Sequence, residues 1–160
     1  MVGGRGDQLR DLRARAGSTG VPAFFPGFVT GDEKTSLLAS AAIGVVPSRR
    51  DMIPGALLEL QSHGLPVIAA DTGGIAEACD DGRAALLVPA GNVGGLAEAM
   101  ARLMSDPALR ARLAWGAFSA STLRTWPRLA HRLEKIYRRH LVRLAPCAIS
   151  GRVEESALQR

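Results

Sequence analysis

Apolar residues gather in short runs that do not alternate with polar residues. Three of these runs lie at Ile43–Val46, Pro66–Ala70 and Ala85–Val88, and a further short run lies at Val21–Phe25. Unbroken apolar runs of this length are typical of strands covered on both faces, as in a parallel sheet. Segments with helical spacing lie between them, which predicts right-handed crossovers. The pattern therefore predicts an α/β fold with a doubly wound parallel sheet.

The start of the chain is interpreted as the remainder of a strand, because only Met1 and Val2 precede a glycine-rich turn. We therefore expect the first strand to be missing or incomplete. Helices are predicted over Asp7–Ala16, from Asp32, from Asn92, from Asp106-Pro107, and from Trp126-Pro127 to about Leu144. Several of these begin with residues that cap helices or occupy their first turn. Residues 1–145 are predicted to form one domain with a helical C-terminal part, and residues 146–160 a flexible tail.

Composition narrows the class of protein. A chain of 160 residues with 47% apolar content fits one globular domain. No apolar run reaches the roughly 20 residues of a membrane span, and the charged N-terminus has no apolar signal core, so a cytoplasmic location is expected. Cys79 and Cys147 lie far apart, which predicts reduced thiols and no metal site. Arginine outnumbers lysine eighteen to two, as in GC-rich bacterial genes.

Charge is distributed unevenly along the chain. Residues 1–100 carry 8 basic and 11 acidic side chains, whereas residues 101–160 carry 12 basic and 4 acidic ones. The basic part has no interleaved aromatic residues and no nucleic-acid motif, so a solvated or interdomain face is predicted and no nucleic acid partner. The predicted last helix has an apolar face, and a row of arginines lies on its other side. This pattern leaves open a peripheral contact with anionic lipid at the inner face of a membrane.

The residues best placed for chemistry follow two of the predicted strands. Asp51 lies in the loop after Ile43–Val46, Glu59 lies in the helix that follows it, and Gly73-Gly74 come after the next strand. Nucleotides bind at the carboxyl ends of parallel strands, carboxylates accept hydrogen bonds from vicinal hydroxyls, and amides around Pro54–Leu57 could face a phosphate. These features describe a sugar-nucleotide pocket. On spacing alone, however, helix caps and helix-dipole partners are the favoured interpretation of the carboxylates.

A longer pattern reverses that preference. The segment VVPSRRDMIPGALLELQSHGLPVIAADTGGIAE closely resembles the donor-site signature of GT-B glycosyltransferases in the large retaining family GT4. The stretches PAFFPGFVTGDEKTSLLASAAIGVVPS, GRAALLVPAGNVGGLAEAMARLMSDPALRARLAWGA and TWPRLAHRLEKIYRRHL resemble neighbouring parts of the same enzymes. The resemblance runs from Gly3 to about Arg143. It implies the Rossmann-like C-terminal half of a GT-B fold, which binds a nucleoside diphosphate sugar and transfers its glycosyl group with retention to an acceptor.

The resemblance also implies roles for individual residues. Asp51 and Glu59 would be the catalytic residues, with Asp51 at the transferred sugar and Glu59 holding the ribose hydroxyls. Gly27 and Phe28 would lie beside the base. The remaining donor-binding positions would be Ser48, Ile53, Pro54, Gly55, Ala56 and Leu57, of which Pro54 to Leu57 would lie beside sugar and phosphates. Retention would follow front-face attack assisted by the leaving diphosphate, and neither a metal nor another cofactor is expected.

Several positions depart from the family pattern. Asp51 stands where Glu is usual, which withdraws the carboxylate by one methylene, and a misplacement of about 1 Å can cost roughly 10²-fold in rate. Gly55 replaces an Asn, and Gln61-Ser62-His63 replaces small or apolar residues. The Lys-Gly segment that supplies cations for the diphosphate, and the N-terminal domain that binds the acceptor, are not among these 160 residues. We therefore expect the chain to be inactive without that N-terminal domain.

Two other functions stay open at this point. One is a sugar-nucleotide epimerase of the same two-domain fold, which would need catalytic carboxylates and a His in its N-terminal half. The other is a non-catalytic module, or one half of a split enzyme, that binds a nucleotide sugar. The missing cations and the change at Asp51 favour this second alternative.

Overall fold

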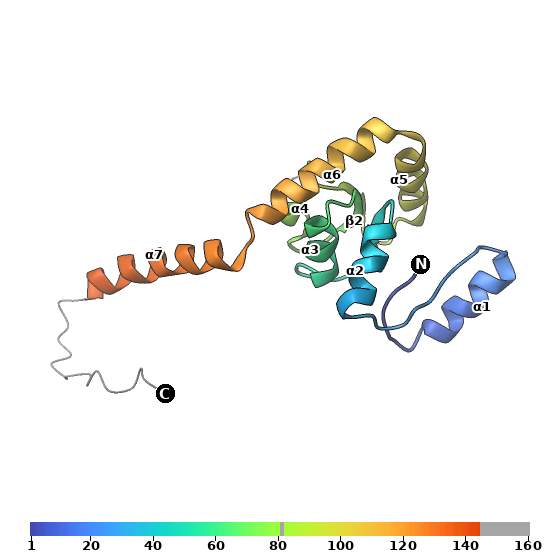
Figure 1. Ribbon diagram of the computed structural model, residues 1–160, viewed down its shortest axis with the longest axis horizontal. Helices are drawn as coiled ribbons and strands as arrows, with labels where there is room; N and C mark the ends of the chain where they lie inside the picture. Colours follow the sequence, from blue (N-terminus) through green and yellow to red (C-terminus); the bar gives the residue numbers. More distant parts are fainter. Residues whose placement is uncertain (81, 145–160) are drawn as a thin grey trace. The chain divides into compact units, whose positions relative to one another are not determined.

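The computed structural model describes residues 1–80 and 82–144 and is built around a parallel sheet. The strands β1 (Gly44–Val46), β2 (Val67–Asp71) and β3 (Leu86–Pro89) lie in the order β1-β2-β3, and both neighbouring pairs are parallel (Figure 1). Parallel neighbours require crossover connections, and helices supply them on both occasions. The predicted α/β class with a parallel sheet is confirmed.

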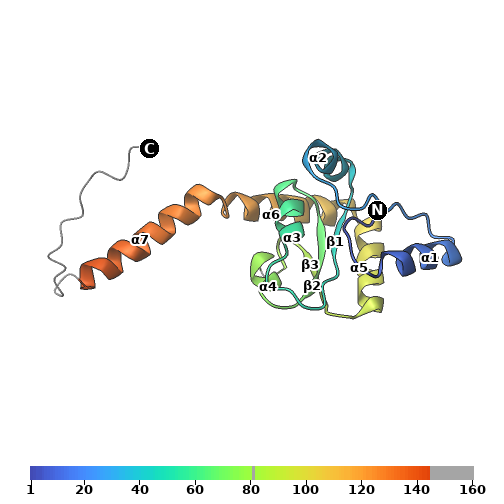
Figure 2. The same cartoon turned by 90° about the horizontal axis from the view of Figure 1, so that it is seen from below.

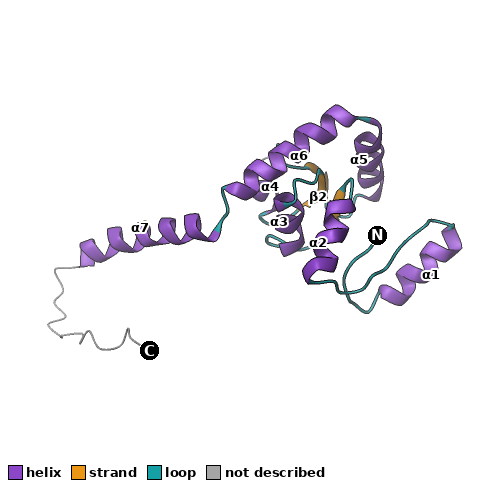
Figure 3. Cartoon of the chain, viewed as in Figure 1, coloured by secondary structure: helices purple, strands orange, loops and turns teal. Residues whose placement is uncertain are grey.

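From α2 to β3 the helices alternate with the strands, and after β3 the helices follow one another (Figure 3). The helices among the described residues are α1 (Leu9–Thr19), α2 (Gly31–Ser40), α3 (Gly55–Ser62), α4 (Ile75–Ala78), α5 (Val93–Ser105), α6 (Pro107–Thr122) and α7 (Trp126–Leu144). Figure 2 shows α3 and α4 on one side of the sheet and α5 on the other. The sheet is therefore the middle of three layers.

The strand β2 is buried on both faces, which explains its unbroken apolar sequence. Successive side chains of a strand point to opposite faces. Val67 and Ala69 pack in one core with Ile75 of α4, while Ile68 packs in a second core with Leu103 of α5. Burying a side chain such as Ile68 completely contributes about 1.5–3 kcal/mol. These two cores hold the layers together and fix the loops at the ends of the strands.

Two helix starts predicted from cap residues are confirmed by side-chain hydrogen bonds. The Gly95 N–H donates to Asn92 Oδ1 over 2.9 Å at the start of α5. The Leu109 N–H donates to Asp106 Oδ1 over 2.8 Å at the start of α6. Each contact satisfies an amide that has no partner within its helix. The starts of α5 and α6 therefore depend on contacts between residues three positions apart in the chain.

The prediction of a strand at Val21–Phe25 is wrong. This segment is irregular, and it makes only scattered backbone contacts with the start of the chain: Val2 N–H to Phe24 C=O over 2.8 Å and Gly4 N–H to Gly27 C=O over 2.7 Å. Pro22 within the segment and Pro26 directly after it have no N–H to donate, so a regular ladder cannot form. The predicted stump of a first strand nevertheless lies beside this segment.

The chain divides into two compact units, Met1–Ser121 and a second one that begins at Thr122. The second unit is described as far as α7, whose apolar row stays exposed: Leu129, Leu133 and Ile136 are 43–45% exposed, and Tyr137 and Leu141 are 64% exposed. None of the described helices is long and apolar enough to cross a membrane. The predicted tail at 146–160 lies outside the described residues, so the predicted boundary at 145 stays a prediction.

Candidate functional site

Two loops meet at the carboxyl ends of neighbouring strands. The loop after β1 carries Asp51, and the turn after β2 contains Gly73 and Gly74. The Gly74 N–H donates to the carbonyl oxygen of Met52 over 2.7 Å. Gly73 has a φ of +55°, and a Cβ at this position would collide with the carbonyl oxygen of Asp51. The two glycines therefore let the backbones approach closely and fix the loop that carries Asp51.

The structure places Asp51 at the surface of this loop. Its side chain is exposed, and its carboxylate makes no hydrogen bond or ion pair with any residue that the structure describes. Ser48, in the same loop, is half-buried, and Ile53 is 44% exposed and lies against Gly74. Proximity along the chain thus brings three predicted donor-binding residues together. An exposed carboxylate without a protein partner is free to accept hydrogen bonds from a ligand.

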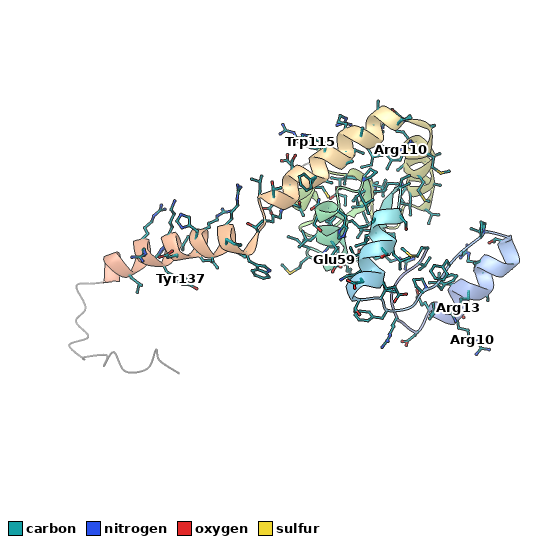
Figure 4. The ribbon with its side chains drawn as sticks, in the orientation of Figure 1. Arg10, Arg13, Glu59, Arg110, Trp115 and Tyr137 are labelled. Atoms are coloured by element: carbon teal, nitrogen blue, oxygen red, sulfur yellow. The ribbon has the colours of Figure 1, made fainter. Side chains whose placement is uncertain are left out.

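The second predicted carboxylate, Glu59, lies in α3 and has a protein partner. Figure 4 labels Glu59 beside α2 and α3. Lys34 of α2 donates a hydrogen bond from Nζ to Glu59 Oε1 over 2.9 Å, and the side chains of Lys34 and Glu59 are 36% and 46% exposed. We did not predict a role for Lys34 from the sequence. One feature of the sequence could have drawn attention to Lys34: the chain has eighteen arginines and two lysines, Lys34 and Lys135.

The first turn of α3 offers two amides. Pro54, at the N-cap, has no N–H, and the Leu57 N–H already donates to the Pro54 carbonyl over 3.0 Å. Gly55 and Ala56 are exposed, and their N–H groups have no backbone partner among the described residues. The Leu57 side chain is fully buried in the core. Of the four predicted positions, Gly55 and Ala56 therefore present backbone donors at the positive end of the helix.

The predicted base-binding residues lie just before α2. Gly27 has a φ of +81° and pairs with Gly3 in an isolated parallel bridge. Phe28 is 64% exposed, and the guanidinium of Arg5 lies 5.4 Å from the centre of its ring. Since α2 also carries Lys34, one short stretch of chain connects the exposed aromatic ring to the Lys34–Glu59 pair. The sequence did not predict this connection.

Another hollow at this edge of the sheet was not predicted. A cavity of about 200 Å³ lies at the ends of β2 and β3, and its lining includes Pro47, Arg49, Val88, Asn92 and Leu96. Arg49 comes from the same loop as Asp51. No group of three or more His, Cys, Asp or Glu side chains that could hold a metal ion occurs in the described part of the chain.

Comparison with known proteins gives a consistent picture. Residues 1–106 match the family model for glycosyl transferases group 1. A D-inositol 3-phosphate glycosyltransferase of Streptomyces bingchenggensis is 34% identical over 131 residues, which are 82% of this chain and 29% of the relative. The chain spans less than a third of the length of the curated relatives that it matches.

Solved structures of the same fold agree with this match. Sucrose-phosphate synthase from Thermosynechococcus elongatus superposes with a TM-score of 0.74 at 24% identity, over 86% of this chain and 35% of that one. The Anabaena protein Alr3699/HepE, solved in complex with UDP, superposes with a TM-score of 0.71 at 20% identity, over 83% of this chain and 40% of that one. The resemblance to a GT-B glycosyltransferase domain with a Rossmann-like sheet is thereby confirmed. The chain belongs to the glycosyl transferases group 1.

Proposed function

We propose that this chain is the nucleotide-sugar-binding half of a retaining glycosyltransferase of the GT4 type. The observation that carries the proposal is the half-exposed carboxylate of Glu59 on α3, a helix whose first amides, at Gly55 and Ala56, have no backbone partners among the described residues. Carboxylates accept hydrogen bonds from vicinal hydroxyls, and free amides at a helix start attract phosphate. The UDP held by the Anabaena protein supports a nucleoside diphosphate as the ligand.

The proposed roles come from the family resemblance, and the exposure of these groups supports them. Glu59 binds the ribose hydroxyls, the Gly55 and Ala56 amides face the diphosphate, Asp51 contacts the transferred hexose, and Phe28 borders the base. In front-face transfer, the bond from the anomeric carbon to the diphosphate oxygen breaks while the acceptor oxygen bonds to the same face. The acceptor proton passes to the leaving diphosphate. These residues bind and orient the donor, and the proposal includes no metal.

The acceptor site is proposed to belong to an N-terminal domain, and the cations for the diphosphate to the Lys-Gly segment that precedes the matched part in the family. Charge-assisted contacts to phosphate are among the strongest hydrogen bonds in proteins, so their loss should abolish transfer. The 160-residue chain alone should bind donor and form no product. Mass spectrometry separates the alternatives, because transfer releases a nucleoside diphosphate and epimerisation leaves the mass of the nucleotide sugar unchanged. Glycoside formation by the chain alone would contradict this part of the proposal.

Calorimetry with UDP and GDP sugars tests the binding site. Glu59→Ala should weaken binding by about 1.5–3 kcal/mol, the range for hydrogen bonds to charged groups. Glu98→Ala is the matched control, because Glu98 is an exposed glutamate on α5, which covers the face of the sheet opposite to α3 (Figure 2). Equal affinities of the wild-type chain and Glu59→Ala would refute the role of Glu59.

A second proposal concerns α7, which we propose contacts anionic lipid. In support, the apolar row Leu129, Leu133, Ile136, Tyr137 and Leu141 is exposed, and the basic residues Arg128, Arg132, Lys135, Arg138 and Arg139 are exposed as well. A helix of this kind lies in the interface of a membrane, with about 1 kcal/mol per basic residue from anionic lipid. Sedimentation with phosphatidylglycerol vesicles should show binding that salt weakens. Equal sedimentation with phosphatidylcholine vesicles, or none with either, would contradict the proposal.

A further inference from the structure

The contact between Lys34 and Glu59 joins two helices that are distant in sequence. Lys34 Nζ lies 2.9 Å from Glu59 Oε1, and 25 residues separate the two positions. The ion pairs Arg83–Asp80 and Arg138–Glu134, in contrast, join residues three and four apart in the chain. The Lys34 side chain is 36% exposed and that of Glu59 is 46% exposed, so the pair is open to a ligand from solvent.

The pair offers a donor beside an acceptor. Glu59 uses Oε1 for Lys34, and no contact to its Oε2 occurs among the described residues. The ammonium group of Lys34 carries three protons, of which this hydrogen bond uses one. A sugar hydroxyl both donates and accepts a hydrogen bond. A carboxylate alone can serve only the donating role of a hydroxyl, whereas the pair can serve both roles at once.

We propose that Lys34 is a further donor-binding residue, which holds Glu59 in position and donates a hydrogen bond to an oxygen of the ribose diol. This inference rests on the proposed function, because it assumes that Glu59 binds the ribose. The position of Lys34 supports it: Lys34 is hydrogen-bonded to Glu59, the proposed contact to the ribose, and lies in the helix that begins three residues after Phe28, the proposed contact to the base. The ligand class is a nucleoside diphosphate with an intact cis-diol.

A purely structural role for the pair explains less. Ion pairs with this degree of exposure contribute about 0–1 kcal/mol to stability, because water screens them and ordering two long side chains costs entropy. Leu37 and Leu38 of α2 are half-buried, so the helix also buries apolar surface that does not depend on the ion pair. A structural role also predicts that all ligands lose affinity equally when Lys34 is replaced. A ligand role predicts a loss confined to ligands that carry the diol.

The test compares UDP with 2′,3′-dideoxy-UDP, which lacks both hydroxyls. Calorimetry with the full 160-residue chain should show that Lys34→Met weakens binding of UDP about tenfold, which corresponds to about 1.4 kcal/mol. Binding of the dideoxy analogue should change less than about twofold. Arg112→Met, which removes an exposed cation on α6, is the matched control and should change neither affinity. If Lys34→Met fails to fold by circular dichroism, Lys34→Ala takes its place with the same expected loss, because it also removes the donor.

The outcomes separate this inference from the function on which it rests. If the wild-type chain binds no UDP, or binds both nucleotides equally, the proposed ribose site and the role of Lys34 are both overturned. If the wild-type chain prefers UDP and Glu59→Ala removes that preference while the Lys34 variant keeps it, the inference alone is wrong. Tighter binding of UDP by Lys34→Met would also overturn it, because Lys34 would then compete with the ribose for Glu59.

Discussion

Replacing Gly73 with alanine should displace the loop that carries Asp51. Gly73 has a φ of +55°, and an added Cβ would collide with the Asp51 carbonyl oxygen and lie 3.2 Å from the Cα of Met52. Both contacts are to backbone, so no side chain can rotate away to relieve them. The loop must move as a whole, and the hydrogen bond from the Gly74 N–H to the Met52 carbonyl, now 2.7 Å, must lengthen or break.

The size of the effect follows from two contributions. A residue with a Cβ in the left-handed region costs roughly 1–2 kcal/mol relative to the right-handed one. A backbone hydrogen bond contributes about 0.5–1.5 kcal/mol net. Gly73→Ala should therefore lower the free energy of unfolding by about 1.5–3.5 kcal/mol. It should also weaken binding of a UDP-sugar more than binding of UDP, because Asp51 is proposed to contact the sugar.

Gly31→Ala supplies the matched control. Gly31 has a φ of +54°, and a Cβ there would meet no atom within 4 Å, so only the backbone strain remains. Urea unfolding followed by circular dichroism should give a loss of roughly 1–2 kcal/mol for this variant. Equal losses for Gly31→Ala and Gly73→Ala would show that the collision with Asp51 is relieved without cost. That result would refute the argument that Gly73 fixes the loop.

Three further predictions concern contacts outside the site. Gln61 is fully buried and donates from Nε2 to a carbonyl of α4 over 3.0 Å, so Gln61→Met should lower the free energy of unfolding by about 1–3 kcal/mol, and an unchanged urea midpoint would contradict this. Arg110 donates to two carbonyls at the end of α5, at 2.6 and 2.9 Å, so Arg110→Met should cost about 1–2 kcal/mol in the same assay, while an exposed arginine such as Arg112 should be neutral. The hydrogen bond from Arg138 holds the pKa of Glu134 below its usual value. The small stabilisation of α7 by this contact is therefore present above the pKa of Glu134 in the unfolded chain and is lost as the pH falls through the pKa in the folded chain. Helicity measured by circular dichroism at low salt should fall on acidification more in the wild-type chain than in Glu134→Gln.

Gln61 also explains one departure from the family pattern. In place of a small or apolar residue, the chain has an amide that is fully buried and bonded to the Ala78 carbonyl. A buried polar group is tolerated when its hydrogen bonds are made, and this one ties α3 to α4. Ser62 and His63 are exposed, so these substitutions cost little. The departure therefore concerns the contact between α3 and α4.

The sequence by itself determined what depends on near neighbours in the chain. The strands at Ile43–Val46 and Pro66–Ala70 follow from unbroken apolar runs, and the starts at Asn92 and Asp106 follow from side chains that reach amides three residues on. Family resemblance also predicted Asp51 and Glu59 as the acids of one signature, and these roles stay predictions. The apolar run at Val21–Phe25 predicted a strand that does not form, because Pro22 and the following Pro26 lack the N–H groups that a ladder needs.

Only the tertiary structure decided which distant groups meet. No local pattern shows that Lys34 reaches Glu59, because the contact depends on how α2 packs beside α3 across 25 residues. Likewise, the sequence shows Gly73 only as a glycine in a turn, and the structure shows that the backbone of Asp51 lies against it. Strand and helix preferences act over a few residues, whereas the geometry of a site depends on the packing of whole elements. The sequence therefore indicated the class of ligand, and the structure supplied the partners that would hold it.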